Sequence, residues 1–374
     1  MVQQPLTVLQ VLPALESGGV EQGVLEIGAE LVQQGHRSII ISAGGYLVET
    51  LKREGSEHYT WPIGAKSPWT LGLVLRLRHF LSEQQVDILH AHSRVPAWVA
   101  WLAWWSMPES IRPRFVTTVH GLYSVNRYSR IMTWGEKVIT VSESARQYVL
   151  ENYPEVRLER LMVIPWGVDP ELYPYGYQPS RAWLTRWERD YPQLQGKKIL
   201  TLPGRLTRLK GHQDFIELIG RLRERGHPVH GLIVGGEDPR RQRYADEIRR
   251  QISHKGLQGA VTFTGHRSDL REVYAISDLV LSLSKKPESF GRTVLEALSL
   301  GAPVIGYDHG GVGEVLGQLF PEGRVPVANP TILSEQVVQF IKAPPKVPKQ
   351  RHYTLQRMLT QTLQCYRTLC GSTL

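Results

Sequence analysis

The chain has 374 residues, of which 41% are hydrophobic and 21% charged, and its formal net charge is +9. This length suits two domains, and the two cysteines, Cys365 and Cys370, give no disulfide framework, which fits a reducing cytoplasm. The most apolar stretch, residues 95–105, is too short to cross a bilayer. We therefore expect a cytoplasmic globular protein whose positive charge favours acidic partners, which could be nucleic acid, anionic lipid or a phosphorylated glycan.

The first half of the chain alternates short apolar runs with longer amphipathic ones, a pattern typical of βαβ units. The N-terminal run is interpreted as a strand and not a signal peptide, because no basic segment precedes a long apolar block. Strands are predicted over residues 7–12, 38–42, 87–91, 115–119 and 138–141, and helices over 20–34, 71–81 and 144–151. Residues 1–172 are therefore predicted to form one doubly wound domain.

Glycine and histidine residues follow several of these strands. Gly18 and Gly19 would let the backbone approach a phosphate, although a simple turn before a helix explains them equally well. His120 ends the strand in T-V-H-G-L-Y, and taken alone it is more often a structural histidine. His90 and His92 in H-A-H-S suggest a metal site, but no third ligand with suitable spacing accompanies them, so a structural role is preferred.

Four tryptophans, Trp98, Trp101, Trp104 and Trp105, crowd the helix-like segment after these histidines. Their spacings of three and four favour a face packed on the core. Contact with a membrane is the alternative, because Trp is favourable at lipid interfaces and the chain is basic.

The second half repeats the architecture of the first. Pro, Tyr and Gly cluster over residues 169–179, where the loss of periodicity predicts a hinge. A second domain is predicted over residues 173–345, with strands at 199–202, 231–234, 261–264, 279–283 and 304–307. Prolines at 344, 345 and 348 precede a last helix, predicted over residues 353–369 within a C-terminal segment of residues 346–374. The fold class is therefore α/β, with two Rossmann-like parallel-sheet domains.

The stretch L-P-G-R-L-T-R-L-K-G places Gly204, Arg205 and Lys210 where a predicted strand ends and a helix begins. Ligands bind at this position in open α/β sheets, and Arg and Lys both suit phosphate oxygens. The spacing of a Walker loop is absent. The sequence therefore predicts an anion site after the first strand of the second domain.

The stretch E-S-F-G-R-T-V-L-E runs from Glu288 to Glu296 and places Phe290 at the predicted start of a helix that ends near residue 300. Unpaired amides at a helix N-terminus bind phosphate well. Four such amides are expected here, those of Gly291, Arg292, Thr293 and Val294. The two carboxylates suit hydroxyl groups on either side of the phosphate, and this combination describes a nucleotide sugar.

Five motifs along nearly the whole chain resemble those of the retaining GT-B glycosyltransferases of family GT4. They are G-G-V-E (18–21), T-V-H-G (118–121), G-R-L-x4-K-G (204–211), E-S-F-G-x4-E (288–296) and G-x-P-V-I (301–305). The resemblance implies two Rossmann-like domains that face a central cleft, with a C-terminal helix that returns to the first domain. One departure is Trp166 in P-W-G-V-D, where many relatives have Asn, so the wall on the hinge side differs.

The resemblance also implies a role for each candidate residue. In the second domain, Arg205 and Lys210 would contact the diphosphate, Glu296 the ribose and Glu288 the hydroxyls of the sugar. Phe290, Gly291, Arg292 and Thr293 are also expected to bind the donor. The first domain would bind the acceptor.

Three further residues receive roles through the resemblance. Gly19 and His120 would meet the donor near the reacting carbon, and the loop that carries Arg267 would lie beside the nucleotide base. For that loop, a cap of the following helix by Ser268 or Asp269 is the structural alternative.

These features predict a retaining glycosyltransferase that moves a sugar from a nucleotide-diphosphate donor, with a UDP-sugar as the first expectation. The expected acceptor is a hydroxyl of a cell-envelope glycan, either the lipopolysaccharide core or a lipid-linked oligosaccharide. No D-x-D sequence occurs, so metal independence is expected, with no cofactor beyond the nucleotide sugar. No residue is a convincing nucleophile, so attack on the face of the leaving group is favoured, with Glu288 as a positioning group.

The expected location is the cytoplasm, with peripheral contact at the anionic inner face of the cytoplasmic membrane. Two alternatives remain, a GT-B nucleotide-sugar epimerase or hydrolase and a non-catalytic basic nucleic-acid-binding protein. Nucleic acid is not the expected partner, because no zinc spacing, RNA-recognition signature or helix-turn-helix pattern is found.

Overall fold

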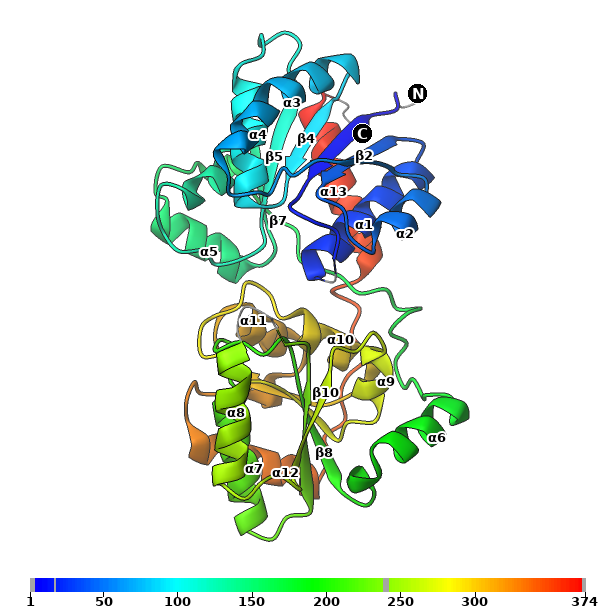
Figure 1. Cartoon of the computed structure of the whole chain (residues 1–374), viewed down its shortest axis with the longest axis vertical. Coiled ribbons are helices and arrows are strands. Elements are labelled where there is room, and N and C mark those ends of the chain that lie inside the picture. The colour runs from blue at the N-terminus through cyan, green and yellow to red at the C-terminus, as the bar shows by residue number, and fades with distance from the viewer. Residues whose placement is uncertain (1–3, 17, 238–241, 372–374) are drawn as a thin grey trace. The chain divides into compact units, whose positions relative to one another are not determined.

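The computed structural model describes residues 4–16, 18–237 and 242–371 (Figure 1). Contacts divide the chain into two domains, each built on its own parallel sheet. The N-terminal domain comprises Met1–Trp166 together with Gln356–Leu374, and the C-terminal domain comprises Gly167–Leu355. The prediction of two α/β domains with parallel sheets is confirmed.

The N-terminal domain has a seven-stranded parallel sheet of order β3-β2-β1-β4-β5-β6-β7. Its strands are β1 (Thr7–Val11), β2 (Arg37–Ser42), β3 (Glu57–Thr60), β4 (Ile88–Ala91), β5 (Arg114–Val119), β6 (Lys137–Thr140) and β7 (Leu161–Val163). The five strands predicted for this half are present, whereas β3 and β7 were not predicted. Both lie at an edge of the sheet and are only partly buried, so they lack the long apolar run that marks a central strand.

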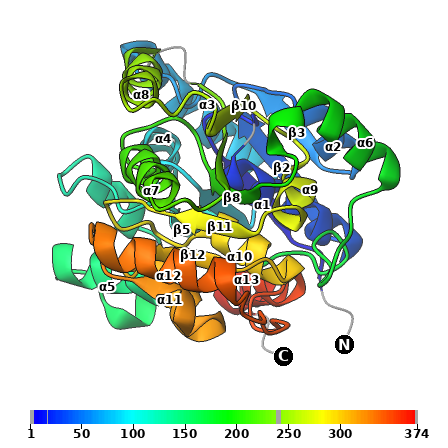
Figure 2. The ribbon, with the colours of Figure 1, turned by 90° about the horizontal axis from the view of Figure 1, so that it is seen from below.

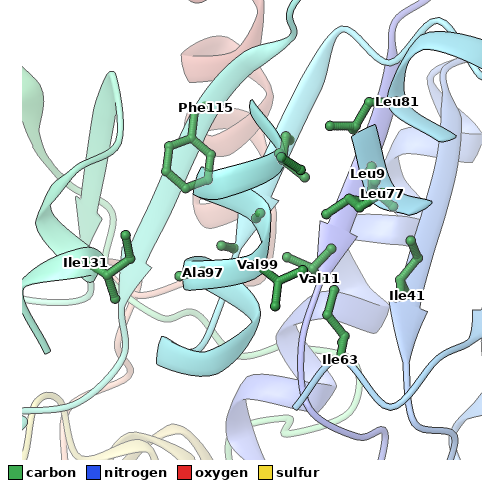
Figure 3. Packing of buried hydrophobic residues seen from close by; sticks show 14 of the residues in the cluster. Leu9, Val11, Ile41, Ile63, Leu77, Leu81, Ala97, Val99, Phe115 and Ile131 are labelled. Carbon is green, nitrogen blue, oxygen red and sulfur yellow. The ribbon is translucent and has the colours of Figure 1, made fainter. Parts of the chain in front are cut away.

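Helices cover both faces of this sheet. They are α1 (Gly19–Gln33), α2 (Val48–Arg53), α3 (Gly72–Glu83), α4 (Arg94–Trp105), α5 (Glu143–Asn152) and most of α13 (Leu355–Leu369), with short 3-10 turns η1 (Pro68–Leu71), η2 (Ser129–Thr133) and η3 (Leu158–Arg160). Side chains alternate along each strand, so Leu9 and Val11 enter the core with Leu77 of α3 and Ala97 of α4 (Figure 3). Between them, Gln10 points to the other face and bonds the carbonyl of Val24 in α1.

The tryptophan-rich helix α4 meets the core mainly through small residues, Ala97, Ala100 and Ala103, which are fully buried. Trp98, Trp101 and Trp104 are partly buried and pack against the same core, as expected for a core-facing set. The core interpretation is wrong for Trp105, which is 64% exposed. Four large rings do not fit on one face of a 12-residue helix whose central stripe is already occupied by alanine.

The C-terminal domain has a six-stranded parallel sheet of order β10-β9-β8-β11-β12-β13. Its strands are β8 (Lys198–Pro203), β9 (Val229–Val234), β10 (Val261–Gly265), β11 (Leu279–Ser282), β12 (Val304–Tyr307) and β13 (Arg324–Val325). The helices are α6 (Arg181–Asp190), α7 (His212–Glu224), α8 (Gln242–His254), α9 (Leu270–Ala275), α10 (Arg292–Leu300), α11 (Gly310–Leu319) and α12 (Pro330–Lys342), with turns η4 (Pro192–Leu194) and η6 (Pro321–Gly323).

Helices α7 and α12 pack together in this domain, and α10 packs beside α11 (Figure 2). Strand order reverses between β8 and β11, because the chain after β8 builds outward through β9 and β10 and then returns to β11. Ligands bind at such a switch point in open α/β sheets. Within the described residues, no helix is both long enough and apolar enough to cross a membrane.

Tyr366 joins the C-terminal helix α13 to the centre of the first sheet. Its hydroxyl lies 2.7 Å from Nδ1 of His90 on β4, and both residues are buried. The change Tyr366→Phe leaves that imidazole nitrogen without its partner, which costs about 1 to 3 kcal/mol. We expect amide hydrogen exchange in α13 to accelerate roughly 10-fold to 100-fold.

The control for this prediction is Tyr59→Phe, because the hydroxyl of Tyr59 bonds the half-exposed Glu57 at 3.3 Å. That change should leave exchange in α13 unaltered. Equal exchange rates in the Tyr366→Phe variant and the wild type would show that the buried bond does not hold α13 to the sheet.

Candidate functional site

An ion pair occupies the switch point of the C-terminal domain. Lys210 follows β8, Glu288 follows β11, and the ammonium nitrogen of Lys210 lies 2.8 and 2.9 Å from the two carboxylate oxygens of Glu288. The two side chains are 27% and 25% exposed, so the pair is accessible to a ligand but only partly hydrated. The structure thus brings together two residues that the sequence places 78 positions apart.

Two glycines allow the loop after β8 to carry Lys210 to this place. Gly204 has φ of +135°, and a Cβ atom there would lie 3.2 Å from the methylenes of Lys210. Gly211 has φ of +74°, and a Cβ atom there would lie 1.9 Å from the carbonyl oxygen of Leu283. Only glycine fits either position without a shift of the backbone or of Lys210.

Glu288 is held ionised by its neighbours. Burial alone would raise the pKa of this carboxyl, but the charge of Lys210 and hydrogen bonds from Lys210 and from the Ser284 hydroxyl hold the pKa below its ordinary value. An ionised carboxylate only accepts hydrogen bonds, so Glu288 is suited to ligand hydroxyls near neutral pH.

The backbone around Glu288 is fixed by the start of α11. The amide of Gly311 donates to the carbonyl of Glu288 at 2.8 Å, and Nε2 of His309 lies 2.7 Å from the carbonyl of Ser284. Phe290 is buried with its ring edge against Tyr353, 5.6 Å between centroids. Phe290 therefore anchors the loop through its side chain. Only its backbone could contact the nucleotide-sugar donor that this residue was predicted to bind.

Helix α10 begins two residues later than predicted, at Arg292, after Gly291 in the left-handed conformation with φ of +117°. The amide of Val294 donates to the carbonyl of Gly291 at 3.0 Å, so the expectation of four unpaired amides is wrong for Val294. This tight first turn forms because the left-handed Gly291 points its carbonyl along the helix. The amides of Gly291 and Thr293 form no hydrogen bond with a described residue.

Glu296 lies in the second turn of α10 and is 7% exposed. Its carboxylate accepts a hydrogen bond from Nε of Arg292 at 3.0 Å and faces the Tyr274 hydroxyl at 3.4 Å. Arg292, one of the predicted donor-binding residues, is thus paired with Glu296 one turn away. Arg205, in contrast, is exposed and forms no hydrogen bond or ion pair with the described part of the chain.

Arg267 is paired within the C-terminal domain and remains partly exposed. Its guanidinium forms two bonds with Asp269, at 2.7 and 2.5 Å, and lies over the ring of Trp187. Asp269 also accepts from the indole nitrogen of Trp183 at 2.7 Å, and the bond from Arg267 is the main cause that lowers its pKa. Asp269 precedes α9 but makes no cap bond with its side chain, so the alternative of an Asp269 side-chain cap is wrong.

In the N-terminal domain, polar side chains from three adjacent strands gather on one face. Gln10 of β1 is in register with His90 of β4, and β4 pairs with β5. His92 lies two residues after His90, as His120 lies two residues after Thr118, and side chains two apart share a face. The five residues therefore line the face toward α1 and α13.

Hydrogen bonds link these residues in two chains. His90 bonds Tyr366 and, through Nε2, the Thr118 hydroxyl at 2.7 Å. His92 lies 3.0 Å from the side-chain oxygen of Gln10 through Nε2 and 3.0 Å from Nε2 of His120 through Nδ1. Within the described residues, no group of three or more His, Cys, Asp or Glu could hold a metal ion.

The bond partners determine where the protons lie. The amide nitrogen of Gln10 donates to Val24, so its oxygen faces His92 and must accept from Nε2 of that ring. A neutral His92 then accepts at Nδ1, and His120 donates to it from Nε2. His120 therefore carries its lone pair on Nδ1.

Burial keeps these rings neutral, because it disfavours the charged imidazolium. It lowers the pKa of His90 and of His120 to about 3 and the pKa of His92 well below its ordinary value. A neutral His120 is a hydrogen-bond acceptor at Nδ1, an atom that is buried in the folded domain.

Trp166, the departure in the P-W-G-V-D segment, forms part of the wall beside His120. The two rings stack with centroids 5.4 Å apart, and a Cβ atom at Gly23 would lie 2.1 Å from the indole. Gly19 is the first residue of α1, with Gly18 as its N-terminal neighbour in extended conformation. A cavity of about 20 Å³ is lined by Gly23, His120 and Trp166, among other residues.

Residues 17–172 match the family described as Glycosyltransferase Family 4, and residues 185–357 match that described as Glycosyl transferases group 1. The chain belongs to the family 4 glycosyltransferases. The N-acetyl-alpha-D-glucosaminyl L-malate synthase of Bacillus anthracis is 25% identical over 332 residues, which cover 85% of this chain and 83% of that protein.

Solved structures confirm the GT-B fold of this family 4 glycosyltransferase. A glycosyltransferase from Rickettsia africae ESF-5 is 29% identical with a TM-score of 0.86, covering 99% of this chain and 100% of that one. Anabaena HepE, solved with UDP and glucose, is 19% identical with a TM-score of 0.82, covering 96% and 99% of the two chains, and this likeness shows the fold alone.

Four residues of the two clusters were missed or undervalued in the sequence. Gln10, His92, Ser284 and His309 belong to none of the five family motifs. Each of them positions another residue of the two clusters by a hydrogen bond. A usable signal existed for His92, since His92 and His120 each follow directly on a strand, and adjacent parallel strands place such residues together. No spacing indicates Ser284 or His309.

The buried histidines predict a pH dependence of stability. Because their pKa values are lowered in the folded protein, the unfolded chain binds more protons between pH 6.5 and about 3. The N-terminal domain should therefore lose stability as the pH falls below 6.5, by about 1.4 kcal/mol per pH unit for each histidine that stays neutral. Urea unfolding followed through the methyl NMR signals of Ala97 and Ala100 measures this.

A His92→Asn variant is the matched control, because it removes one titrating ring and should reduce the slope of stability against pH. Stability that is constant between pH 6.5 and 5 in the wild type would contradict the neutral network.

Proposed function

We propose that this glycosyltransferase takes a sugar from a nucleoside-diphosphate donor, with UDP as the nucleotide, and retains the anomeric configuration. The C-terminal domain binds the donor and the N-terminal domain the acceptor. The observation that carries the proposal is the Lys210–Glu288 ion pair at the switch point, 2.8 Å long and followed in sequence by the start of α10.

The diphosphate would be neutralised by protein groups. Arg205 is exposed and has no hydrogen-bond or ion-pair partner among the described residues, Lys210 presents an ammonium group, and the amides of Gly291 and Thr293 open α10. Helix N-termini and such cations both favour phosphate oxygens. Because these groups can offset the charge of the leaving diphosphate, we propose that no metal ion or other cofactor is needed.

Donor binding would change the role of Glu288. A diphosphate that draws Lys210 toward itself weakens the ion pair and leaves carboxylate oxygens to accept from hydroxyls of the sugar. Glu296, already oriented by Arg292, would accept from the ribose. His120, with its lone pair on Nδ1, would accept from a hydroxyl near the reacting carbon.

The transfer would occur on one face of the sugar. The bond between the anomeric carbon and the diphosphate oxygen breaks with its electron pair on the diphosphate, the acceptor oxygen bonds to the same carbon, and its proton passes to the departing phosphate. No protein nucleophile is required, so Glu288 positions the sugar and does not attack it.

The UDP assignment is supported by Anabaena HepE, which has the same fold and was solved with UDP and glucose. For the acceptor we propose a cell-envelope glycan, either the lipopolysaccharide core or a lipid-linked oligosaccharide, at the inner face of the cytoplasmic membrane. The net charge of +9 supports an acceptor that is itself anionic or embedded in anionic lipid.

Loss of the proposed phosphate contacts should slow transfer. Arg205→Ala and Lys210→Ala should each lower the turnover number by roughly 10²-fold or more, the scale of one preorganised charge-stabilising donor. Release of UDP during transfer from a UDP-sugar to a glycan acceptor measures this rate.

Arg208→Ala is the matched control, because Arg208 lies in the same loop but pairs with Glu247 on the surface. Rates near that of the wild type in both the Arg205 and Lys210 variants would remove the diphosphate assignment. Activity that EDTA abolishes and Mg²⁺ restores would disprove metal independence, and a free epimer or free sugar as the sole product would favour the epimerase or hydrolase alternative.

A further inference from the structure

The N-terminal domain exposes large apolar side chains around η1 and the first turns of α3. Trp69 is 88% exposed, Leu71 63% and Leu75 70%. Single exposed apolar residues are common on proteins, but three within seven positions form a patch, and contiguous apolar patches mark interaction sites. We call the surface formed by residues 65–67 and 69–78 together with Trp98 and Tyr128 the η1–α3 surface.

A groove of about 460 Å³ runs along this surface between η1 and α4. Leu71, Val95, Trp98, Leu102 and Tyr128 contribute its apolar lining, and Lys66 lies at its rim. Because the indole nitrogen of Trp98 donates to the carbonyl of Tyr128 at 3.0 Å, the polar part of this ring is satisfied within the protein. The ring can therefore face an apolar ligand.

The charge of the η1–α3 surface is of one sign. Residues 61–82, 93–108 and 120–135 include no Asp or Glu, and their cations are Lys66, Arg76, Arg78, Arg94, Arg127 and Arg130. Arg130 pairs with Glu155, and Arg94 lies over the rings of Tyr123 and Tyr128. Lys66, Arg76, Arg78 and Arg127 are exposed and form no ion pair with a described residue, and Arg76 lies over the ring of Trp61, 4.2 Å from its centroid.

From this combination we infer that the η1–α3 surface docks on an anionic lipid bilayer. Trp69, Leu71 and Leu75 enter the boundary between headgroups and acyl chains, and Lys66, Arg76 and Arg78 meet lipid phosphates. Amphipathic surfaces bind bilayers by this pairing of apolar insertion with basic residues. Single-stranded nucleic acid could stack on the aromatic rings, but it would leave the exposed Leu71 and Leu75 without an apolar partner.

This inference deepens the proposed function, since a membrane-borne acceptor requires a surface that meets the membrane. Its test does not involve sugar transfer. Transfer to a short water-soluble acceptor is measured separately, so that each proposal can fail alone.

The test is co-sedimentation of the full chain with vesicles of phosphatidylcholine, either alone or mixed with phosphatidylglycerol. We expect binding to the mixed vesicles and at least roughly tenfold weaker binding to phosphatidylcholine alone. A Trp69→Ser, Leu75→Ser double variant and an Arg76→Gln, Arg78→Gln double variant should each bind the mixed vesicles at least roughly tenfold more weakly than the wild type. The first pair removes apolar insertion, and the second removes attraction to lipid phosphate.

The matched control is Tyr46→Ser, which removes a ring that is 77% exposed beside Leu47, in the other helix layer of the same domain. It should bind vesicles like the wild type, and circular dichroism verifies the fold of every variant. Absence of wild-type binding to the mixed vesicles, or equal binding by the Trp69→Ser, Leu75→Ser variant, overturns the inference. So does a wild-type dimer in solution that this double variant dissociates, because a second copy would then cover the surface.

Discussion

The candidate site depends on one interaction, the contact between Lys210 and Glu288 at the reversal of strand order in the C-terminal sheet. Two glycines with positive φ bring Lys210 there, and the hydrogen bonds of Ser284 and Gly311 hold Glu288. A partly buried pair of opposite charges is stable in the absence of ligand, yet either member can exchange its partner for a phosphate or a hydroxyl. Burial without the pair would favour a protonated Glu288, whereas the pair keeps it ionised.

The polar cluster of the N-terminal domain consists of neutral hydrogen-bond donors and acceptors, in contrast to the charged pair of the C-terminal domain. Gln10 orients His92, and His92 orients His120. The side-chain amide of Gln10, two hydrogen bonds away, therefore determines which nitrogen of His120 is the acceptor. Neutral imidazoles suit the recognition of hydroxyl groups, and they avoid the cost of burying charge. The two candidate sites thus differ in their chemistry, with charged groups at the switch point of the C-terminal sheet and neutral donors and acceptors in the N-terminal domain.

Much of this architecture was predictable, because central parallel strands are continuous apolar runs and the stretches proposed to bind phosphate follow them directly. The strands before Arg205 and His120 were located within one or two residues for this reason. The edge strands β3 and β13 were missed for different reasons. Strand β3 is only partly buried, and β13 has only two residues, so neither gives a periodic hydrophobic signal. Hydrogen bonds between side chains that are far apart in the sequence could not be predicted either. Nothing in the R-S-D segment shows that Asp269 bonds Trp183 and Arg267 instead of capping α9.

The most direct measurement of the central claim is the position of the diphosphate in crystals of the full chain grown with UDP. We predict phosphate oxygens within hydrogen-bond distance of the Lys210 ammonium group and of the first amides of α10, with the contact between Lys210 and Glu288 lengthened from 2.8 Å. A diphosphate bound elsewhere, with that contact unchanged, would contradict the account.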